Sequence, residues 1–163
     1  MARDAIARQY DVERNSVTLV PEPVKGNYCP GTIAFQAKKG RSIDLEKLRE
    51  SIAATRLSGG TKMSVDWLEI TALGEVVARG EELLLKVSGC GQELVLGENP
   101  EAKTVMQRLR EAQARGTKVT RVTGRVHGWT GRFPDVLRAL APDAAGVRKR
   151  TLLLVTDFEI GKR

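Results

Sequence analysis

The side chains that could carry out nucleophilic or acid–base chemistry are few in this chain of 163 residues. Cys29 and Cys90 are its two cysteines, and His127 is its one histidine. Cys90 and His127 could form a thiol–base pair or half of a metal site if the fold brought them together. No nucleophile motif, paired carboxylate pattern or Walker-type loop accompanies them. The sequence therefore predicts that the protein is not an enzyme.

A second group of interest lies in one stretch of the C-terminal half, where aromatic and basic side chains alternate. It consists of His127, Trp129, Arg132 and Phe133. Long surface loops often carry contacts, and aromatic groups next to cations suit nucleic-acid binding. We therefore expect this stretch to be a binding loop.

The charge of the chain is uneven along its length. The formal net charge is +7, and residues 74–163 hold 16 basic and 11 acidic residues, whereas residues 1–73 hold 11 and 9. A basic second half favours nucleic acid, anionic lipid or an acidic protein as a partner, although a solvated basic surface is the simpler explanation. The charge alone does not decide between these.

Two features concern the compartment of the protein. No apolar run approaches the roughly 20 residues that a membrane-spanning helix needs. The N-terminal residues contain acidic side chains and no apolar core, which is unlike a signal peptide. We expect no membrane span and a soluble protein of the cytoplasm, or of the periplasm if a leader has been removed.

The first half is predicted to contain two strands and a helix. Alternating apolar residues predict strands at residues 16–20 and 32–37, and apolar residues at helical spacing predict a helix at residues 43–56. Asp44 is placed to cap that helix. Residues 1–15 precede these elements as an N-terminal arm. A further strand at residues 66–74 completes a βαβ unit over residues 16–74.

This unit resembles part of a known family. The run TIAFQAKKGRSIDLEKLRESIAATRL and the following WLEITALG are similar to the second half of a heavy-metal-associated domain. That family has a ferredoxin-like fold and binds soft metal ions through a Cys-x-x-Cys loop. Cys29 lies in the matching stretch, but Thr32 stands where the second cysteine would be. The resemblance implies a copper or zinc site at Cys29, which would need ligands from elsewhere because one thiolate cannot fill it.

The second half has the element order of an OB-fold. Strands are predicted at residues 69–79, 82–88 and 92–96, and then at residues 118–129 and 151–160. Between these two groups a helix is predicted, with Asn99 as its N-cap and Gly116 at its end. Its predicted buried stripe consists of Ala102, Val105, Met106, Leu109 and Ala112. A long insertion at residues 128–150 separates the last two strands. The alternation places four apolar residues on the outward face of the barrel, and these are Leu84, Val95, Leu153 and Val155.

Together these features predict an α+β chain in which a partial ferredoxin-like βαβ unit shares the strand at residues 66–74 with a five-stranded OB-like β-barrel at residues 66–163. The predicted function is that of a non-catalytic binding or assembly subunit, working through contacts with a protein partner or with copies of itself in a metal-handling or redox system. Soft-metal binding through Cys29 is the alternative, and nonspecific nucleic-acid binding by the basic barrel is a third hypothesis. No cofactor is expected apart from such a metal ion.

Overall fold

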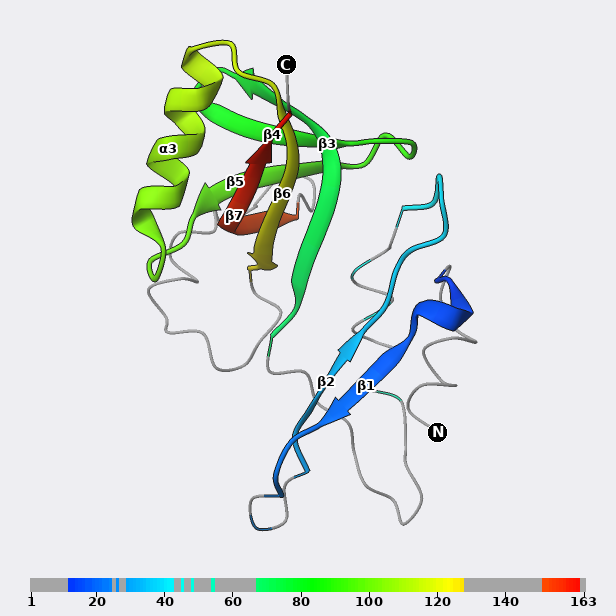
Figure 1. Cartoon of the computed structure of the whole chain (residues 1–163). Coiled ribbons are helices and arrows are strands. Elements are labelled where there is room, and N and C mark those ends of the chain that lie inside the picture. The colour runs from blue at the N-terminus through cyan, green and yellow to red at the C-terminus, as the bar shows by residue number, and fades with distance from the viewer. Residues whose placement is uncertain are drawn as a thin grey trace. The chain divides into compact units, whose positions relative to one another are not determined.

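The computed structural model describes residues 12–24, 26, 29–42, 45, 48, 54, 67–127 and 151–161. The chain divides into two compact units, Met1–Ser64 and Val65–Arg163 (Figure 1). This division lies close to the predicted start of the barrel at residue 66.

The first unit contains a two-stranded antiparallel sheet. Its strands are β1 (Thr18–Pro21) and β2 (Gly31–Ala34), and a 3-10 turn, η1 (Arg14–Ser16), precedes them. Val12 and Val17 are buried, and Ile33 and Phe35 pack against them. A bridge between Val12 and Ala37 extends the pairing. The end of the predicted N-terminal arm is therefore part of this small core.

The predicted helix of the first unit is described at only a few positions. Leu45, Leu48 and Ala54 are helical, and the two leucines are buried while Ala54 is exposed. The two leucines belong to the predicted apolar stripe, which is confirmed at these positions. The other residues of the predicted helix lie outside the described residues, so the ferredoxin-like βαβ unit remains a prediction.

The second unit is a sheet of five strands that closes on itself. The strands are β3 (Glu69–Arg79), β4 (Glu82–Val87), β5 (Glu93–Glu98), β6 (Val119–Val126) and β7 (Leu152–Ile160). Their order is β3-β4-β5-β7-β6, and β6 pairs with β3 to close the ring. Neighbouring strands are antiparallel except β5 and β7, which are parallel. The mixed α+β class and the five strands predicted for this half are confirmed.

Strand β3 is the longest strand of the ring, with 11 residues, and its two parts pair with different neighbours. Its first part, from Glu69 to Leu73, pairs with β6, and its second part, from Gly74 to Arg79, pairs with β4. Gly74 lies where the pairing changes from one partner to the other. Whether the first unit also shares this strand, as predicted, remains a prediction.

The core of the second unit is built from one side of each strand. Cross-strand pairs such as Val76 with Leu85, and Leu85 with Leu94, place buried residues on a common face. Leu153 pairs with both Leu96 and Val126 and therefore belongs to the same face. The prediction that Leu153 and Val155 face outward is wrong, and both are fully buried. Leu84 does lie on the opposite face of β4, but it is buried as well.

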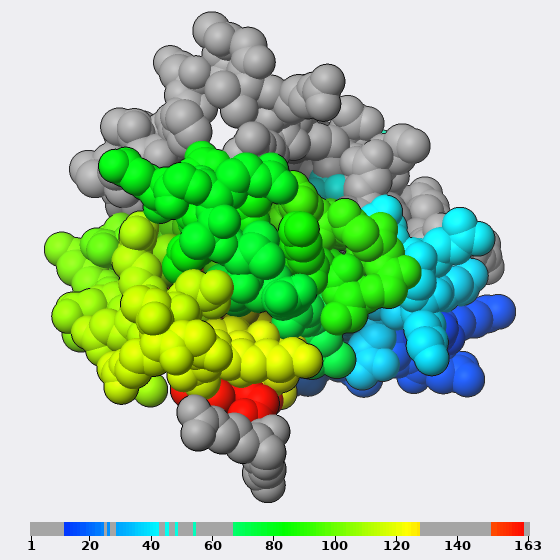
Figure 2. Space-filling view, turned by 90° about the horizontal axis from the view of Figure 1, so that it is seen from above, coloured from blue at the N-terminus to red at the C-terminus, as the bar shows by residue number. Residues whose placement is uncertain are grey.

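Helix α3 (Lys103–Ala114) connects β5 to β6. Its buried residues are Met106, Leu109 and Ala112, as the apolar stripe predicted. Asn99 does not cap the helix itself, because its side chain accepts a hydrogen bond from the Glu101 backbone N–H at 2.9 Å and forms a turn before the helix. Gly116 ends the helix with a positive φ of 68°. Residues of α3 and of the turn after it reach the surface in the space-filling view, yellow-green to yellow (Figure 2).

Within the described part of the chain, no helix has the length and apolar character needed to cross a membrane.

Candidate functional site

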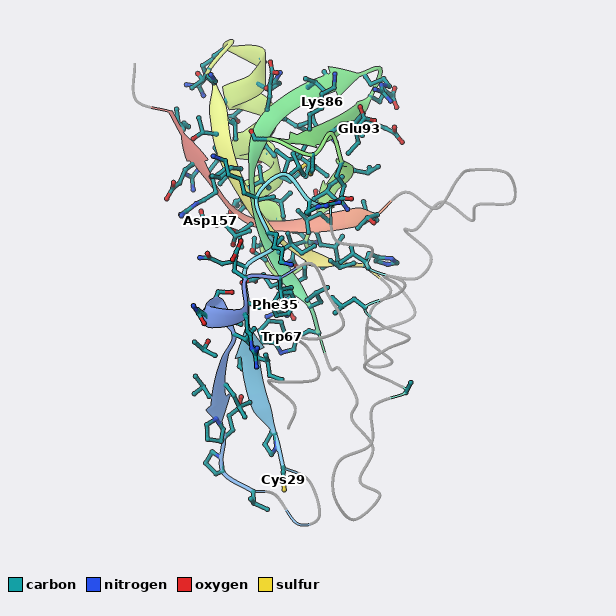
Figure 3. The ribbon with its side chains drawn as sticks, turned by 90° about the vertical axis from the view of Figure 1, so that its right-hand side faces the viewer. Cys29, Phe35, Trp67, Lys86, Glu93 and Asp157 are labelled. Atoms are coloured by element: carbon teal, nitrogen blue, oxygen red, sulfur yellow. The ribbon has the colours of Figure 1, made fainter. Side chains whose placement is uncertain are left out.

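Cys29 lies in the connection between β1 and β2 and is exposed (Figure 3). Thr32, which stands where the heavy-metal-associated family has its second cysteine, is part of β2 and is also exposed. Cys29 is therefore accessible to a metal ion, but its match in the family motif is replaced by a hydroxyl group, which is a poor ligand for soft metals.

The structure does not bring Cys90 and His127 together. Cys90 lies in the turn between β4 and β5, and the end of β4 pairs with Gly74 on β3. His127 follows the end of β6, where the Val126 N–H donates to the carbonyl of Leu68. Leu68 and Gly74 are six positions apart along this extended segment, a span of roughly 20 Å. Among the described residues, no group of three or more histidine, cysteine or acidic side chains could hold a metal ion.

His127 is half-buried, and its backbone N–H donates to the carbonyl of Leu152 at 2.9 Å. Burial removes water that would stabilise the imidazolium ion, and this lowers the pKa of His127 from its ordinary value of 6.5. We therefore expect the imidazole to be neutral at pH 7. A neutral imidazole can accept a proton or bind a metal ion, and the described residues place no group of three or more histidine, cysteine or acidic side chains around it.

The lowered pKa of His127 predicts a pH-dependent stability. In the unfolded chain its pKa is about 6.5, so below that pH the unfolded state binds more protons than the folded state. The free energy of unfolding should therefore fall as the pH falls from about 7.5 to about 5, and His127→Gln should make this fall shallower. Urea unfolding of both proteins across that range measures the difference. Equal pH slopes for the two proteins would contradict the prediction.

The predicted binding loop is described only at its first residue, His127. Trp129, Arg132 and Phe133 lie outside the described residues, so their role as a binding loop remains a prediction.

A cluster that the sequence did not indicate lies at the start of β3. The guanidinium group of Arg125 stands 5.4 Å from the ring centre of Trp67, which is a cation–π contact. The same guanidinium lies 3.6 Å from the carboxylate of Glu101. The three residues are far apart in sequence and meet because Arg125 pairs with Glu69 across β6 and β3. An alternation extended back from β3 to Trp67 would have been the signal for this outward position.

The cluster continues into an exposed surface on the outward side of β3 and β6. Thr71 and Thr123 pair across the two strands, and their hydroxyl groups are hydrogen-bonded at 2.9 Å. Leu73 pairs with Arg121, which forms an ion pair with Glu159 on β7. The exposed fraction is 45% for Trp67 and 62% for Leu73. We call this surface the β3–β6 face, and it consists of Trp67, Thr71, Leu73, Arg121, Thr123 and Arg125.

Charge is segregated in the described part of the second unit. Residues 103–118, which contain α3 and the turn after it, hold five basic residues and one acidic residue, whereas the other described residues of this unit hold four basic and nine acidic residues. The strands are therefore acidic and the helical segment is basic. Much of the positive excess of the second half lies in residues 128–150, which hold five basic and two acidic residues.

Comparisons of the chain with protein-family models, with curated proteins and with solved structures found no match. The resemblance to a heavy-metal-associated domain therefore rests on the quoted residues alone.

Proposed function

We propose that this chain is a non-catalytic binding or assembly subunit that works through protein contacts made by the β3–β6 face. The observation that carries this proposal is the exposure of two large apolar side chains, Leu73 on β3 and Trp67 two residues before the start of β3. They lie on the side that carries Arg121 and Arg125. Two large apolar side chains on one face lose their contact with water only when a partner covers them. Because the chain resembles a metal-handling family, we propose that this assembly belongs to a metal-handling or redox system.

The composition of the β3–β6 face supports this proposal. Tryptophan and arginine are enriched among the residues that dominate binding energy in protein interfaces. Arg121 and Arg125 are already held by Glu159 and Glu101, so their planar groups are positioned before a partner arrives. Less side-chain entropy is then lost on binding than with free arginines.

A similar feature in the first unit points to the same class of function. All four residues of β1 are exposed. Leu19 and Val20 are neighbours in this strand and therefore point to opposite faces, with exposed fractions of 49% and 62%. A two-stranded sheet that presents apolar residues on both faces is poorly stable by itself. Contact with a partner would cover these residues.

We also infer that the second unit has an OB-like architecture. The inference is supported by the element order, by the closed ring of five strands and by the parallel pairing of β5 with β7. Helix α3 lies between the third and fourth strands of this unit in chain order, β5 and β6, which fits the same plan. The ligand class does not follow from this architecture, because such folds host many functions.

Two other functions have less support. Soft-metal binding is favoured by the exposure of the Cys29 thiol, which leaves it accessible. Nucleic-acid binding is weakened by the charge balance of the described barrel residues, where nine basic residues stand against ten acidic ones. Three of the four strand arginines and lysines are also held in ion pairs, and these are Arg79, Arg121 and Arg125.

The test is Leu73→Asp in the full chain. We expect the wild-type protein, purified without tag or chelator, to appear by native mass spectrometry either at a defined multiple of its own mass or with a bound partner protein. An aspartate in the middle of the interface would bury an unpaired charge, so the assembled fraction should drop about tenfold or more.

Glu75→Gln is the matched control, because it also changes one charge at an exposed outward position of β3, two residues away. It should leave the assembly intact. A monomer without a partner in the wild-type protein would overturn the proposal. A stoichiometric soft metal that is lost in Cys29→Ser would favour the alternative function instead.

A further inference from the structure

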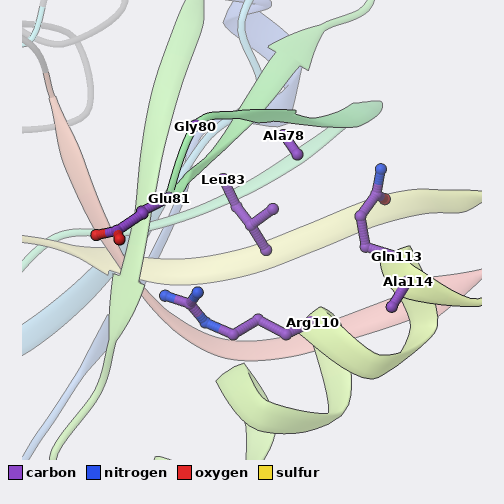
Figure 4. A pocket seen from close by; sticks show the side chains of 7 residues that line it. All are labelled: Ala78, Gly80, Glu81, Leu83, Arg110, Gln113 and Ala114. Atoms are coloured by element: carbon purple, nitrogen blue, oxygen red, sulfur yellow. The ribbon is translucent and has the colours of Figure 1, made fainter.

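The basic segment at residues 103–118 combines its charge with two grooves, one on each side of α3. The larger groove has a volume of about 650 Å³ and lies between the C-terminal half of α3 and the turn that joins β3 to β4. Leu83 and Ala78 line it from the strands, while Arg110 and Gln113 line it from the helix (Figure 4). It therefore has an apolar floor and a cation at its rim.

The smaller groove lies on the other side of the same helix. Its volume is about 210 Å³, and its apolar lining comes from Phe158 and Ile160 at the end of β7. Ile160 is an exposed apolar residue, with an exposed fraction of 51%. Arg108 lies over the ring of Phe158 at 5.7 Å, and Arg115 forms an ion pair with Glu111 at 3.1 Å.

The cations of this segment differ from those on the strands in having few acidic partners. Arg79, Arg121 and Arg125 on the strands each lie within ion-pairing distance of a carboxylate. Within the described residues, Lys103, Arg110 and Lys118 have no such carboxylate. Lys103 and Arg110 are seven positions apart on α3, so they lie on the same side of the helix. Their charge is available to a partner.

We infer that the surface of α3 and its two grooves is a second docking site, which binds an acidic segment of a protein that carries an apolar anchor side chain. The anchor occupies the larger groove over Leu83, and the carboxylates of the segment pair with Arg110 and Lys103. Charge complementarity selects the segment, and the apolar floor adds affinity that a purely ionic contact lacks.

A protein segment fits this site better than a nucleic acid. Glu81 lines the larger groove and Glu111 lines the smaller one, so a continuous run of phosphates would meet a negative charge on each side of the helix. The apolar side chains of the two grooves also cannot form hydrogen bonds or ion pairs with phosphate groups. An acidic segment with spaced carboxylates and an aliphatic side chain avoids both problems.

The experiment measures the binding of a fluorescent model peptide to the full-length chain by anisotropy. The probe contains aspartates and glutamates around one central leucine. We expect binding that weakens as salt is added, and a loss of affinity of about tenfold or more in Arg110→Glu, which turns an attraction into a repulsion. Removing the leucine from the peptide should also weaken binding by about tenfold, since the anchor then leaves the groove empty.

Lys86→Glu is the matched control, because Lys86 is an exposed strand cation whose reversal changes the net charge equally. It should change the affinity by less than about twofold. An equal loss in both variants would overturn the inference, because the effect would then come from net charge alone. Three other results would also overturn the inference. They are binding of single-stranded DNA of the same charge as tightly as the peptide, no binding of the peptide at low salt, and self-association of the chain through its acidic strands.

This site is independent of the β3–β6 face. Leu73→Asp, which is expected to lower the assembled fraction about tenfold or more, should leave peptide binding unchanged, and Arg110→Glu should leave the assembly unchanged. The failure of one proposal is therefore distinguishable from the failure of the other. Tryptophan fluorescence of each variant verifies that the second unit, which contains both tryptophans of the chain, is still folded.

Discussion

Gly74→Ala is expected to unfold the second unit or to bring it close to unfolding. A Cβ atom at this position would overlap the carbonyl oxygen of Lys86 and stand 2.9 Å from the carbonyl carbon. The obstacle is the backbone of β4, which cannot move without breaking the pairing of β3 with β4. Gly74 also lies where β3 changes from pairing with β6 to pairing with β4, so the strand cannot shift there without breaking one of the two pairings. We expect a loss of about 3 kcal/mol or more in the free energy of unfolding.

Gly97→Ala provides the control for this prediction. Gly97 is also a strand glycine, and a Cβ atom there would approach an atom at 2.8 Å, but that atom is a terminal methyl group of Leu152. A leucine side chain can rotate away, so the cost should stay near 1 kcal/mol. Urea unfolding followed by tryptophan fluorescence measures both variants, because Trp67 and Trp129 both belong to the second unit. Equal destabilisation by the two alanines would contradict the argument.

The strands and the helix of the second unit were predictable because their signals are local. Alternation of apolar and polar residues marks β3, and glycines mark the turns after β3 and after β4, where Gly80, Gly89 and Gly91 have positive φ. Gly116 ends α3 in the same way. Each signal spans a few residues, so it does not depend on the rest of the fold.

The face of β7 could not be predicted in this way. Residues 152–155 are all apolar, so the strand has no alternation that distinguishes its two sides. The register is set instead by the parallel pairing with β5, in which Leu153 lies opposite Leu96. This pairing forms only when the ring closes, because the two strands are separated by α3 and β6. The inward position of Leu153 is therefore a property of the whole barrel.

The cluster around Arg125 and the segregation of charge could not be predicted either, because both depend on which strands pair in the folded chain. Trp67, Glu101 and Arg125 are separated by more than twenty residues from one another, and no local pattern connects them. Counts of charged residues in each half of the chain did not show the segregation of charge, because the second half combines α3 with the acidic strands. Only the fold separates the basic helical segment from the strands around it.

Leu153→Ala is expected to destabilise the second unit by about 3 kcal/mol, within the usual range for a buried leucine. The Leu153 side chain is fully buried, and its neighbour on β6 is Gly124, where a Cβ atom would stand 2.7 Å from the leucine Cγ. Since Gly124 has no side chain that could move into the space, truncation of Leu153 should leave a cavity that the barrel cannot close. Urea unfolding followed by tryptophan fluorescence measures the loss.

Leu73→Ala is the same substitution at a leucine with an exposed fraction of 62% and should change stability by less than about 0.5 kcal/mol. The pair of variants separates a buried Leu153 from an exposed one. If Leu153 were exposed to solvent, its truncation would cost as little as that of Leu73. A large loss at Leu153 together with a small one at Leu73 therefore supports the buried position beside Leu96 and Gly124.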